Sequence, residues 1–180
     1  MIVGTKVRLR ALTRSDLPNL VRWRNDPAVS DYLVRRSLPA SIEQESDWFE
    51  RSLSSQDAIR LAIETLAGGE HIGYIVLSGI DWRSRRAELG ILIGETRYQN
   101  QNYGSDATVA LLTYAFKELG LHRVYVEILE SNSRSIKMFE RIGFQLEGRL
   151  REHVYRNGAY HGVLVMAIID RELAAGRDSA

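Results

Sequence analysis

A polar segment rich in amide side chains leads into the strongest helical pattern of the chain. It runs from Thr96 to Ser105 and reads TRYQNQNYGS. A loop at a helix start presents unpaired backbone N–H groups and the positive end of the helix dipole, which together bind anions. The segment therefore predicts a phosphate site. An ordinary turn is the alternative, because the chain lacks the GxxxxGKS/T loop of nucleotide hydrolases and keeps only Gly104 of a GxGxxG dinucleotide loop.

Any catalysis must use oxygen and nitrogen groups, because the chain has no cysteine. This excludes disulfides, thiolate nucleophiles and cysteine metal sites. The histidines are His71, His122, His153 and His161. They are too scattered for a zinc pattern, and we expect no metal cofactor.

Apolar periodicity predicts the elements that must position the loop. Alternating residues predict strands over residues 6–12, 59–64, 72–77, 87–93, 123–129, 144–147, 152–156 and 160–169. Helical spacing predicts helices over residues 14–24, 41–53, 104–119 and 132–142. The strands between residues 59 and 93 follow one another through short polar turns, which indicates an antiparallel meander.

Turn and cap residues mark the ends of these elements. Ser41 followed by Gln44 has the capping-box spacing of a helix start. Asn132 can cap the helix that Gly143 closes. The pair Asn157-Gly158 predicts a final hairpin, and we expect the tail after it to be frayed.

The composition fits one soluble globular domain, with 180 residues, 44% hydrophobic and 26% charged. The formal net charge of +1 gives no long-range attraction to nucleic acid or to an anionic membrane. No apolar run reaches the ~18 residues of a membrane span. The N-terminus MIVGTKVRLR lacks the pattern of a secretion signal, so we expect a cytoplasmic location.

Motifs in a fixed order cover almost the whole chain. They are VRLRAL at 7–12, WRNDP at 23–27, RAELGILIG at 86–94, YQNQNYGSDA at 98–107, NSRSIKMFERIGF at 132–144 and LEGRLRE at 146–152. In this order they resemble the GCN5-related N-acetyltransferase (GNAT) superfamily, specifically its RimJ/RimL-like branch. One such motif alone is a weak signal, whereas the ordered set is a specific one.

The resemblance implies an α/β fold of the GNAT type. The sheet would be mixed but mostly antiparallel, with about seven strands, a splayed centre and about four flanking helices. We expect residues 1–170 to form a single GNAT domain and residues 171–180 to form a C-terminal tail. A homodimer through the terminal strands is common in this branch and is the oligomer that the resemblance implies.

The resemblance also implies acetyl-CoA as cosubstrate and assigns its pyrophosphate to the loop before residue 104. Gln99 and Gly104 match the family pattern, and Asn102 replaces its middle glycine. Asparagine tolerates left-handed backbone, so the cradle can persist. The strand over 91–93 would pair with pantetheine. The implied coenzyme contacts are Ile91, Leu92, Ile93, Gln99, Asn100, Gln101, Asn102, Tyr103, Gly104, Ser105, Asn132 and Ser135.

Members of the family acetylate a primary amine, which attacks the thioester directly. An alkylamine of pKa ~10.4 is almost entirely protonated at neutral pH, so a base is needed, whereas an α-amine near ~8 needs less help. We expect Glu88 to be the base, with Glu152 or water as alternatives. A surface ion pair with Arg85 or Arg86 is the other interpretation of Glu88.

Many family members carry tyrosine, as the acid that protonates the thiolate, where this chain has Phe139. We therefore expect Ser135, one helical turn earlier, to serve the departing thiolate. A structural role in the first turn of a capped helix is the alternative for this serine.

The resemblance allows more than one class of acceptor. The acceptor could be a protein N-terminus, a polyamine or another small amine, with Trp23, Tyr32 and Tyr155 as expected contacts. A cluster of acidic residues favours a cationic acceptor: Asp26, Asp31, Glu43, Glu45 and Asp47. Phe139 and Asn102 suggest a catalytically weak acetyl-CoA-binding sensor as the alternative function.

Overall fold

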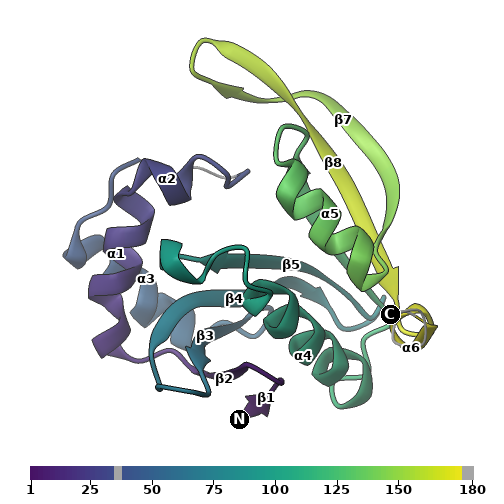
Figure 1. Cartoon of the computed structure of the whole chain (residues 1–180), viewed down its shortest axis with the longest axis horizontal. Coiled ribbons are helices and arrows are strands. Elements are labelled where there is room, and N and C mark those ends of the chain that lie inside the picture. Colours follow the sequence, from purple (N-terminus) through teal and green to yellow (C-terminus); the bar gives the residue numbers. More distant parts are fainter. Residues whose placement is uncertain (35–37, 176–180) are drawn as a thin grey trace.

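The computed structural model describes residues 1–34 and 38–175, and in them one mixed eight-stranded sheet carries all other elements (Figure 1). In spatial order its strands are β1 (Ile2–Val3), β2 (Val7–Ala11), β3 (Ile59–Thr65), β4 (His71–Asp81), β5 (Arg86–Ile93), β6 (Arg123–Leu129), β8 (Ala159–Ile169) and β7 (Gln145–Arg156). All neighbouring pairs are antiparallel except β5 and β6, which are parallel.

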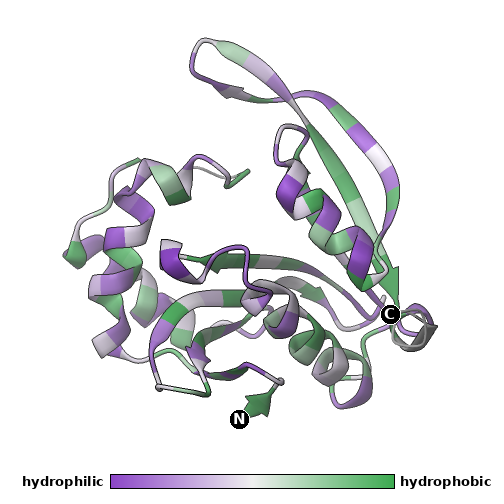
Figure 2. Ribbon diagram, viewed as in Figure 1, coloured by the Kyte–Doolittle hydropathy of each residue, from purple (hydrophilic) through white to green (hydrophobic). Residues whose placement is uncertain are grey.

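The helices form two groups around this sheet. They are α1 (Leu17–Asn25), α2 (Pro27–Ser30), α3 (Ile42–Leu53), α4 (Tyr103–Lys117), α5 (Ser133–Ile142) and α6 (Glu172–Ala175), with short 3-10 turns η1 (Arg14–Asp16) and η2 (Thr96–Tyr98). Strand alternation sends Leu89 into the main core under α4 and α5, and Leu92 into a second core under α1 to α3. Each of the longer helices α1, α3, α4 and α5 contributes buried apolar residues, and Figure 2 shows both apolar and polar residues along them.

The predicted helix ends are confirmed at several positions. The Ser41 hydroxyl accepts a hydrogen bond from the Gln44 backbone N–H at 3.3 Å, and the Gln44 side chain accepts one from Ser41 N at 2.9 Å. Gly143 ends α5 with φ 112°, and Gly120 follows α4 with φ 66°. Glycine is favoured at both positions because the side chain of any other residue would clash with the backbone at these positive φ angles.

The sheet splits between its two parallel strands. Only residues 86–88 of β5 pair with β6, opposite residues 123–125, although both strands continue further. Beyond Glu88 the strands diverge, and the β7–β8 hairpin rises away from β5 (Figure 1). The splayed centre implied by the family resemblance is thus present, and it leaves one edge of β5 open.

Three details differ from the sequence prediction. The pair Ile2–Val3 adds a short strand, giving eight strands rather than about seven. The segments 144–147 and 152–156, expected as separate strands, fall on one irregular strand β7, which begins at Gln145 and has register shifts along its pairing with β8. Part of the expected frayed tail forms α6, and the rest of it, residues 176–180, lies outside the described residues. No helix in the described ranges is both long and apolar enough to cross a membrane.

A buried ionic network anchors the start of α1 to the sheet. Asp16, 3% exposed, accepts two hydrogen bonds from the Arg10 guanidinium at 2.8 and 2.9 Å and one from Thr13 N at 2.8 Å. Arg10 also donates to Glu64 at 2.7 Å. Burial by itself raises the pKa of the Asp16 carboxyl, but the Arg10 and Thr13 hydrogen bonds outweigh it and lower this pKa to about 2.

The Asp16→Asn substitution is expected to lower the free energy of unfolding by about 3 kcal/mol at neutral pH, because it removes a buried carboxylate from the half-buried Arg10 guanidinium, which keeps only Glu64 as an ionised partner. The Asp16 pKa is lower in the folded chain, so its stabilisation is present above pH ~4 and is lost as the pH falls toward ~2. Urea unfolding between pH 7 and 2.5 should therefore show a wild-type advantage that shrinks with acid. Asp47→Asn, at an exposed position of α3, is the control. Equal stability of Asp16→Asn and wild type at pH 7 would contradict this prediction.

Candidate active site

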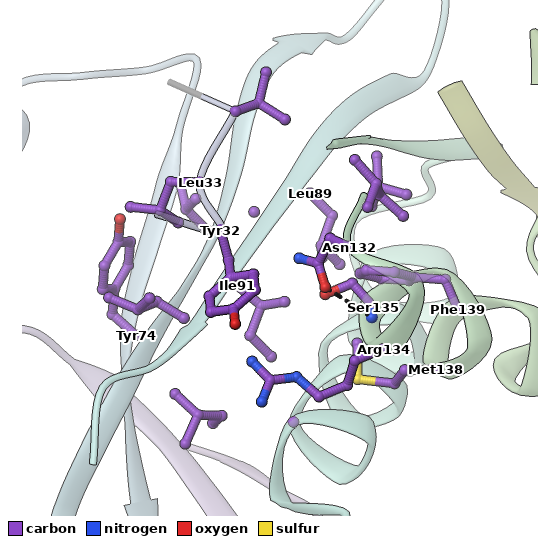
Figure 3. Close-up of a pocket in the computed structure, with 18 of the residues that line it drawn as sticks. Tyr32, Leu33, Tyr74, Leu89, Ile91, Asn132, Arg134, Ser135, Met138 and Phe139 are labelled. Atoms are coloured by element: carbon purple, nitrogen blue, oxygen red, sulfur yellow. Dashed lines mark hydrogen bonds between the residues drawn. The ribbon is translucent and has the colours of Figure 1, made fainter. Parts of the chain in front are cut away.

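A pocket of about 770 Å³ lies where β5 and β6 diverge. Its walls are β5, the loop that leads into α4, the exposed end of β6 and the first turns of α5. On the other side of β5 the pocket continues beneath residues of α1 to α3. Figure 3 shows side chains from both sides pointing into it, with Tyr32 and Tyr74 opposite Asn132 and Ser135.

The loop before α4 has the backbone shape of an anion cradle. Asn100 and Asn102 both adopt left-handed conformations, with φ 60° and 65°. This confirms the conformation expected at Asn102. The first hydrogen bond of α4 runs from Asp106 N to Asn102 O at 3.0 Å. Helix geometry therefore leaves the N–H groups of residues 103–105 to partners outside the helix, and Gly104 and Ser105 line the pocket.

Contacts with the first strands fix the position of this loop. The Asp106 carboxylate accepts backbone hydrogen bonds from Thr5 and Lys6 at 2.8 Å and from Val7 at 3.0 Å. Burial raises the pKa of the Asp106 carboxyl, but the hydrogen bonds from these donors lower the pKa by more than that. The net pKa is therefore below its ordinary value, and the carboxylate stays ionised. The Lys6 ammonium donates to the Gln101 carbonyl at 3.0 Å. Asp106 was not predicted as a site residue, because its only signal in the sequence is an acid in the first helical turn.

The open edge of β5 is partly used by the loop itself. Gln99 Nε2 donates to the Ile93 carbonyl at 2.9 Å, and Arg134 donates to Gln99 Oε1 at 3.2 Å. Backbone groups alternate between the two edges of a strand, so Ile91 faces the open edge as Ile93 does. Leu92 lies opposite Tyr74 of β4, and its backbone is turned toward that strand. Of the three β5 residues expected at pantetheine, Leu92 therefore offers only its side chain.

The first turn of α5 brings two expected residues to the pocket. Asn132, 6% exposed, accepts a hydrogen bond on Oδ1 from Ser135 N at 3.2 Å, which Figure 3 draws as a dashed line. This cap uses the backbone N–H of Ser135 and not its hydroxyl, and Ser135 lines the pocket. Phe139, one turn later, stacks edge-to-face on Phe144 with ring centroids 4.9 Å apart. It fills the core and has no proton to donate.

Two carboxylates line the pocket at the point where the strands separate. Glu88 lies opposite Ser78 of β4 and Tyr125 of β6. Glu127, two residues beyond Tyr125, is the second. Glu127 was not predicted as a site residue, because only the pairing of β5 with β6 shows which residues of β6 reach the split. Glu152 is exposed on β7 and does not line the pocket, because β8 lies between β7 and β6.

The residues expected at the acceptor separate into two groups. Tyr32 lines the pocket, with the Arg134 guanidinium 5.1 Å from its ring centroid. Trp23 does not, because it is 1% exposed and its ring is enclosed by His71 and by the backbone at Gly94. Tyr155 is 66% exposed on the β7–β8 hairpin and is outside the pocket.

Two expected coenzyme contacts also lie outside the pocket lining. Gln101 is exposed, and its backbone is held by Lys6. Tyr103 packs edge-to-face on Tyr98, with ring centroids 5.1 Å apart. Both therefore shape the loop rather than form the pocket wall.

None of the five acidic residues expected near the acceptor is among the residues that line the pocket, and two of them have partners within the fold. Glu45 is 1% exposed and forms an ion pair with Arg24. Its burial raises the pKa of the carboxyl, and Arg24 opposes the rise. Asp26 caps α2 by accepting a hydrogen bond from Ala28 N at 2.9 Å. Within residues 1–34 and 38–175, no three acidic or histidine side chains form a group that could hold a metal ion.

Comparison with known proteins fits this geometry. The family model described as "Acetyltransferase (GNAT) domain" matches residues 6–145. The chain belongs to the GNAT family of acetyltransferases. It is 33% identical to the putative ribosomal N-acetyltransferase YdaF of Bacillus subtilis, over 94% of each chain. It is 29% identical to the spermidine N(1)-acetyltransferase of Escherichia coli K12, over 94% of this chain and 89% of the relative.

A solved acetyltransferase structure shares the fold and contains the coenzyme. The spermidine N-acetyltransferase of Vibrio cholerae, solved with CoA and spermine, superposes with a TM-score of 0.88 at 25% identity. The match covers 95% of this chain and 99% of that chain. This GNAT protein is thus an N-acetyltransferase that uses acetyl-CoA as cosubstrate and an amine as acceptor. Gly104 and the left-handed residues Asn100 and Asn102 all line the pocket.

Proposed function

We propose that the pocket transfers the acetyl group of acetyl-CoA to the primary amine of a small molecule or a protein N-terminus. One observation carries the proposal: a single pocket joins the α4 N-terminus, the open edge of β5 and the carboxylate of Glu88. An anion cradle, a strand edge and a base are the three parts that this reaction requires.

The coenzyme half of the pocket has matching groups for each part of acetyl-CoA, which supplies an acetyl thioester for direct attack by the amine. Backbone N–H groups at Gly104 and Ser105 would hold the pyrophosphate, with the positive end of the α4 dipole behind them. The Arg134 guanidinium, on the same side, adds a cation. The Ile91 backbone would pair with the amides of pantetheine.

The catalytic half needs a proton acceptor and a group near the sulfur. Glu88 would accept the proton of the incoming amine, directly or through water. The Ser135 hydroxyl would donate a hydrogen bond to the departing thiolate. The ordinary pKa of a thiol is ~8.5, so the thiolate needs little help to leave. Glu127 lies in the same wall and is the carboxylate to compare with Glu88.

The test measures binding and turnover separately. Calorimetric titration with acetyl-CoA should show one site per chain, and thiol release should occur with at least one class in a panel of diamines, amino acids and peptide N-termini. Tight binding of acetyl-CoA without thiol release for any amine between pH 7 and 9 would instead indicate a sensor. No binding of acetyl-CoA would overturn the whole assignment of the pocket.

Strand β7 forms one outer edge of the sheet. We propose that residues 1–170 act as one catalytic domain and that two copies associate through the terminal strands. Strand β7 supports this, because it is the outermost strand next to β8 and most of its residues are exposed. Membership of the RimJ/RimL-like branch stays a prediction.

A further inference from the structure

The part of the pocket beneath α1 to α3 has a floor formed by one face of β3, β4 and β5. Cross-strand pairing places Arg60 opposite Val76, and Val76 opposite Gly90. The next row on this face pairs Ser78 with Glu88. Side chains two residues apart share a face, so Arg60 and Glu88 both point into this space, from strands about 10 Å apart. Of the five residues in these two rows, only Arg60 and Glu88 are charged. The other three, Val76, Ser78 and Gly90, are short and uncharged.

Gly90 keeps the space between these two charges open. A Cβ at Gly90 would lie 3.1 Å from the Val76 side chain, so a larger residue would fill the middle of the floor. Gly90 and Val76 both line the pocket. The floor therefore runs without a polar interruption from the carboxylate of Glu88 to the guanidinium of Arg60.

The roof above Arg60 is aromatic and cationic. The Trp48 ring of α3 lies over Arg60, with the guanidinium carbon 5.6 Å from the ring centroid. Arg24 of α1 lines the same region but forms an ion pair with buried Glu45. All three charges act on the Tyr74 hydroxyl. Burial raises the pKa of Tyr74 most, Glu45 raises it further, and Arg24 and Arg60 lower it.

Among the residues that the structure describes, the charges at this end leave one cation in excess. The pair of Arg24 with Glu45 is neutral as a unit, whereas Arg60 has an aromatic partner. In the described ranges of the chain, no carboxylate lies within ion-pair distance of Arg60. A half-buried guanidinium of this kind is stabilised by an anion that binds in the pocket, and its planar fork fits a carboxylate.

We infer that the acceptor is a small zwitterion, an amine that carries a carboxylate at its other end, with the amine at Glu88 and the carboxylate at Arg60. This inference rests on the proposed function and adds the substrate class. A diamine of the same length would instead place an ammonium group against Arg60 and Arg24. Charge complementarity at both ends thus selects amino acids over polyamines.

The test compares ω-amino acids and α,ω-diamines with three to six methylene groups. Both series present an alkylamine of similar pKa, so only the far end differs. We expect the wild-type kcat/KM to be at least tenfold higher for the better amino acids than for diamines of equal length. Arg60→Gln should remove this preference, mainly by raising the KM for amino acids. Arg60→Glu should reverse it, and Arg60→Lys should restore part of it.

The control is Arg151→Gln, at an exposed position on β7 away from the pocket, which should leave both series unchanged. Thermal unfolding of each variant shows whether the fold is intact. A wild-type preference for diamines, or an equal loss of both series in Arg60→Gln, would overturn the inference while leaving the acetyltransferase function in place.

A second measurement keeps the inference testable if no amine is acetylated. Calorimetric titration of 5-aminopentanoate into the CoA-loaded protein should show binding that Arg60→Gln weakens at least tenfold and Arg151→Gln does not. Absence of turnover with this pattern would contradict the proposed function alone. Equal affinity of wild type and Arg60→Gln would contradict the zwitterion inference alone.

Discussion

The Gly104→Trp substitution is expected to weaken acetyl-CoA binding by at least about 100-fold, equivalent to about 3 kcal/mol. Gly104 is in the first turn of α4, and a Cβ there would lie 3.5 Å from both the Ile93 and Met138 side chains. Both neighbours line the pocket, so an indole has no direction to take except into the coenzyme site. Calorimetric titration with acetyl-CoA measures the effect directly.

The size of the new side chain should determine the loss. Gly104→Ala adds only a methyl group at ordinary contact distance and is expected to cost tenfold at most. Gly68→Trp, in an exposed turn between β3 and β4, introduces the same side chain away from the pocket and should bind normally. If Gly104→Trp bound acetyl-CoA with normal affinity and kept its fold by circular dichroism, the coenzyme would not bind at this loop.

The Glu88→Gln substitution is expected to lower kcat/KM for alkylamines by about 100-fold at neutral pH, the scale of a lost general base. Glutamine keeps the shape of the side chain in β5 but cannot accept the proton of the amine. Raising the pH deprotonates the free amine and should restore part of the rate, so the pH–rate profile should shift upward. An acceptor with a less basic α-amine should lose less.

Two further carboxylate variants separate the base from its neighbours. Glu152→Gln, outside the pocket, should behave as wild type. Glu127→Gln, across the split on β6, should retain the wild-type profile if Glu88 is the base. An unchanged profile in Glu88→Gln together with a shifted one in Glu127→Gln would move the base to β6. Unchanged profiles in all three would leave water as the base.

Features that depend on neighbouring residues were predictable from the sequence. The Ser41–Gln44 cap, the left-handed turn at Asn102 and the glycine that ends α5 each follow from the backbone preferences of one or two residues. The meander of β3 to β5 follows from its short turns. The ordered motifs then implied the GNAT fold and the coenzyme loop, because that loop lies within one short stretch of chain.

The strand order decided which distant residues meet in the pocket, and the sequence did not contain that information locally. Glu127 reaches the split because β6 pairs with only the first residues of β5. Glu152 is kept away because β8 is inserted between β6 and β7. Trp23 has an aromatic side chain of the kind that often contacts substrates, but the packing of α1 buries it.

The end of the pocket proposed for the acceptor shows most clearly what the sequence predicts locally and what only strand pairing decides. Alternation along β3 and along β5 indicates which residues share a face, but not which row of one strand lies opposite which row of another. Only the register of β3, β4 and β5 places Arg60 and Glu88 over one floor. Sequence determines local conformation through short-range sterics and hydrogen bonds, whereas long-range pairing is set by the burial of the whole core, and it is this pairing that joins the two charges.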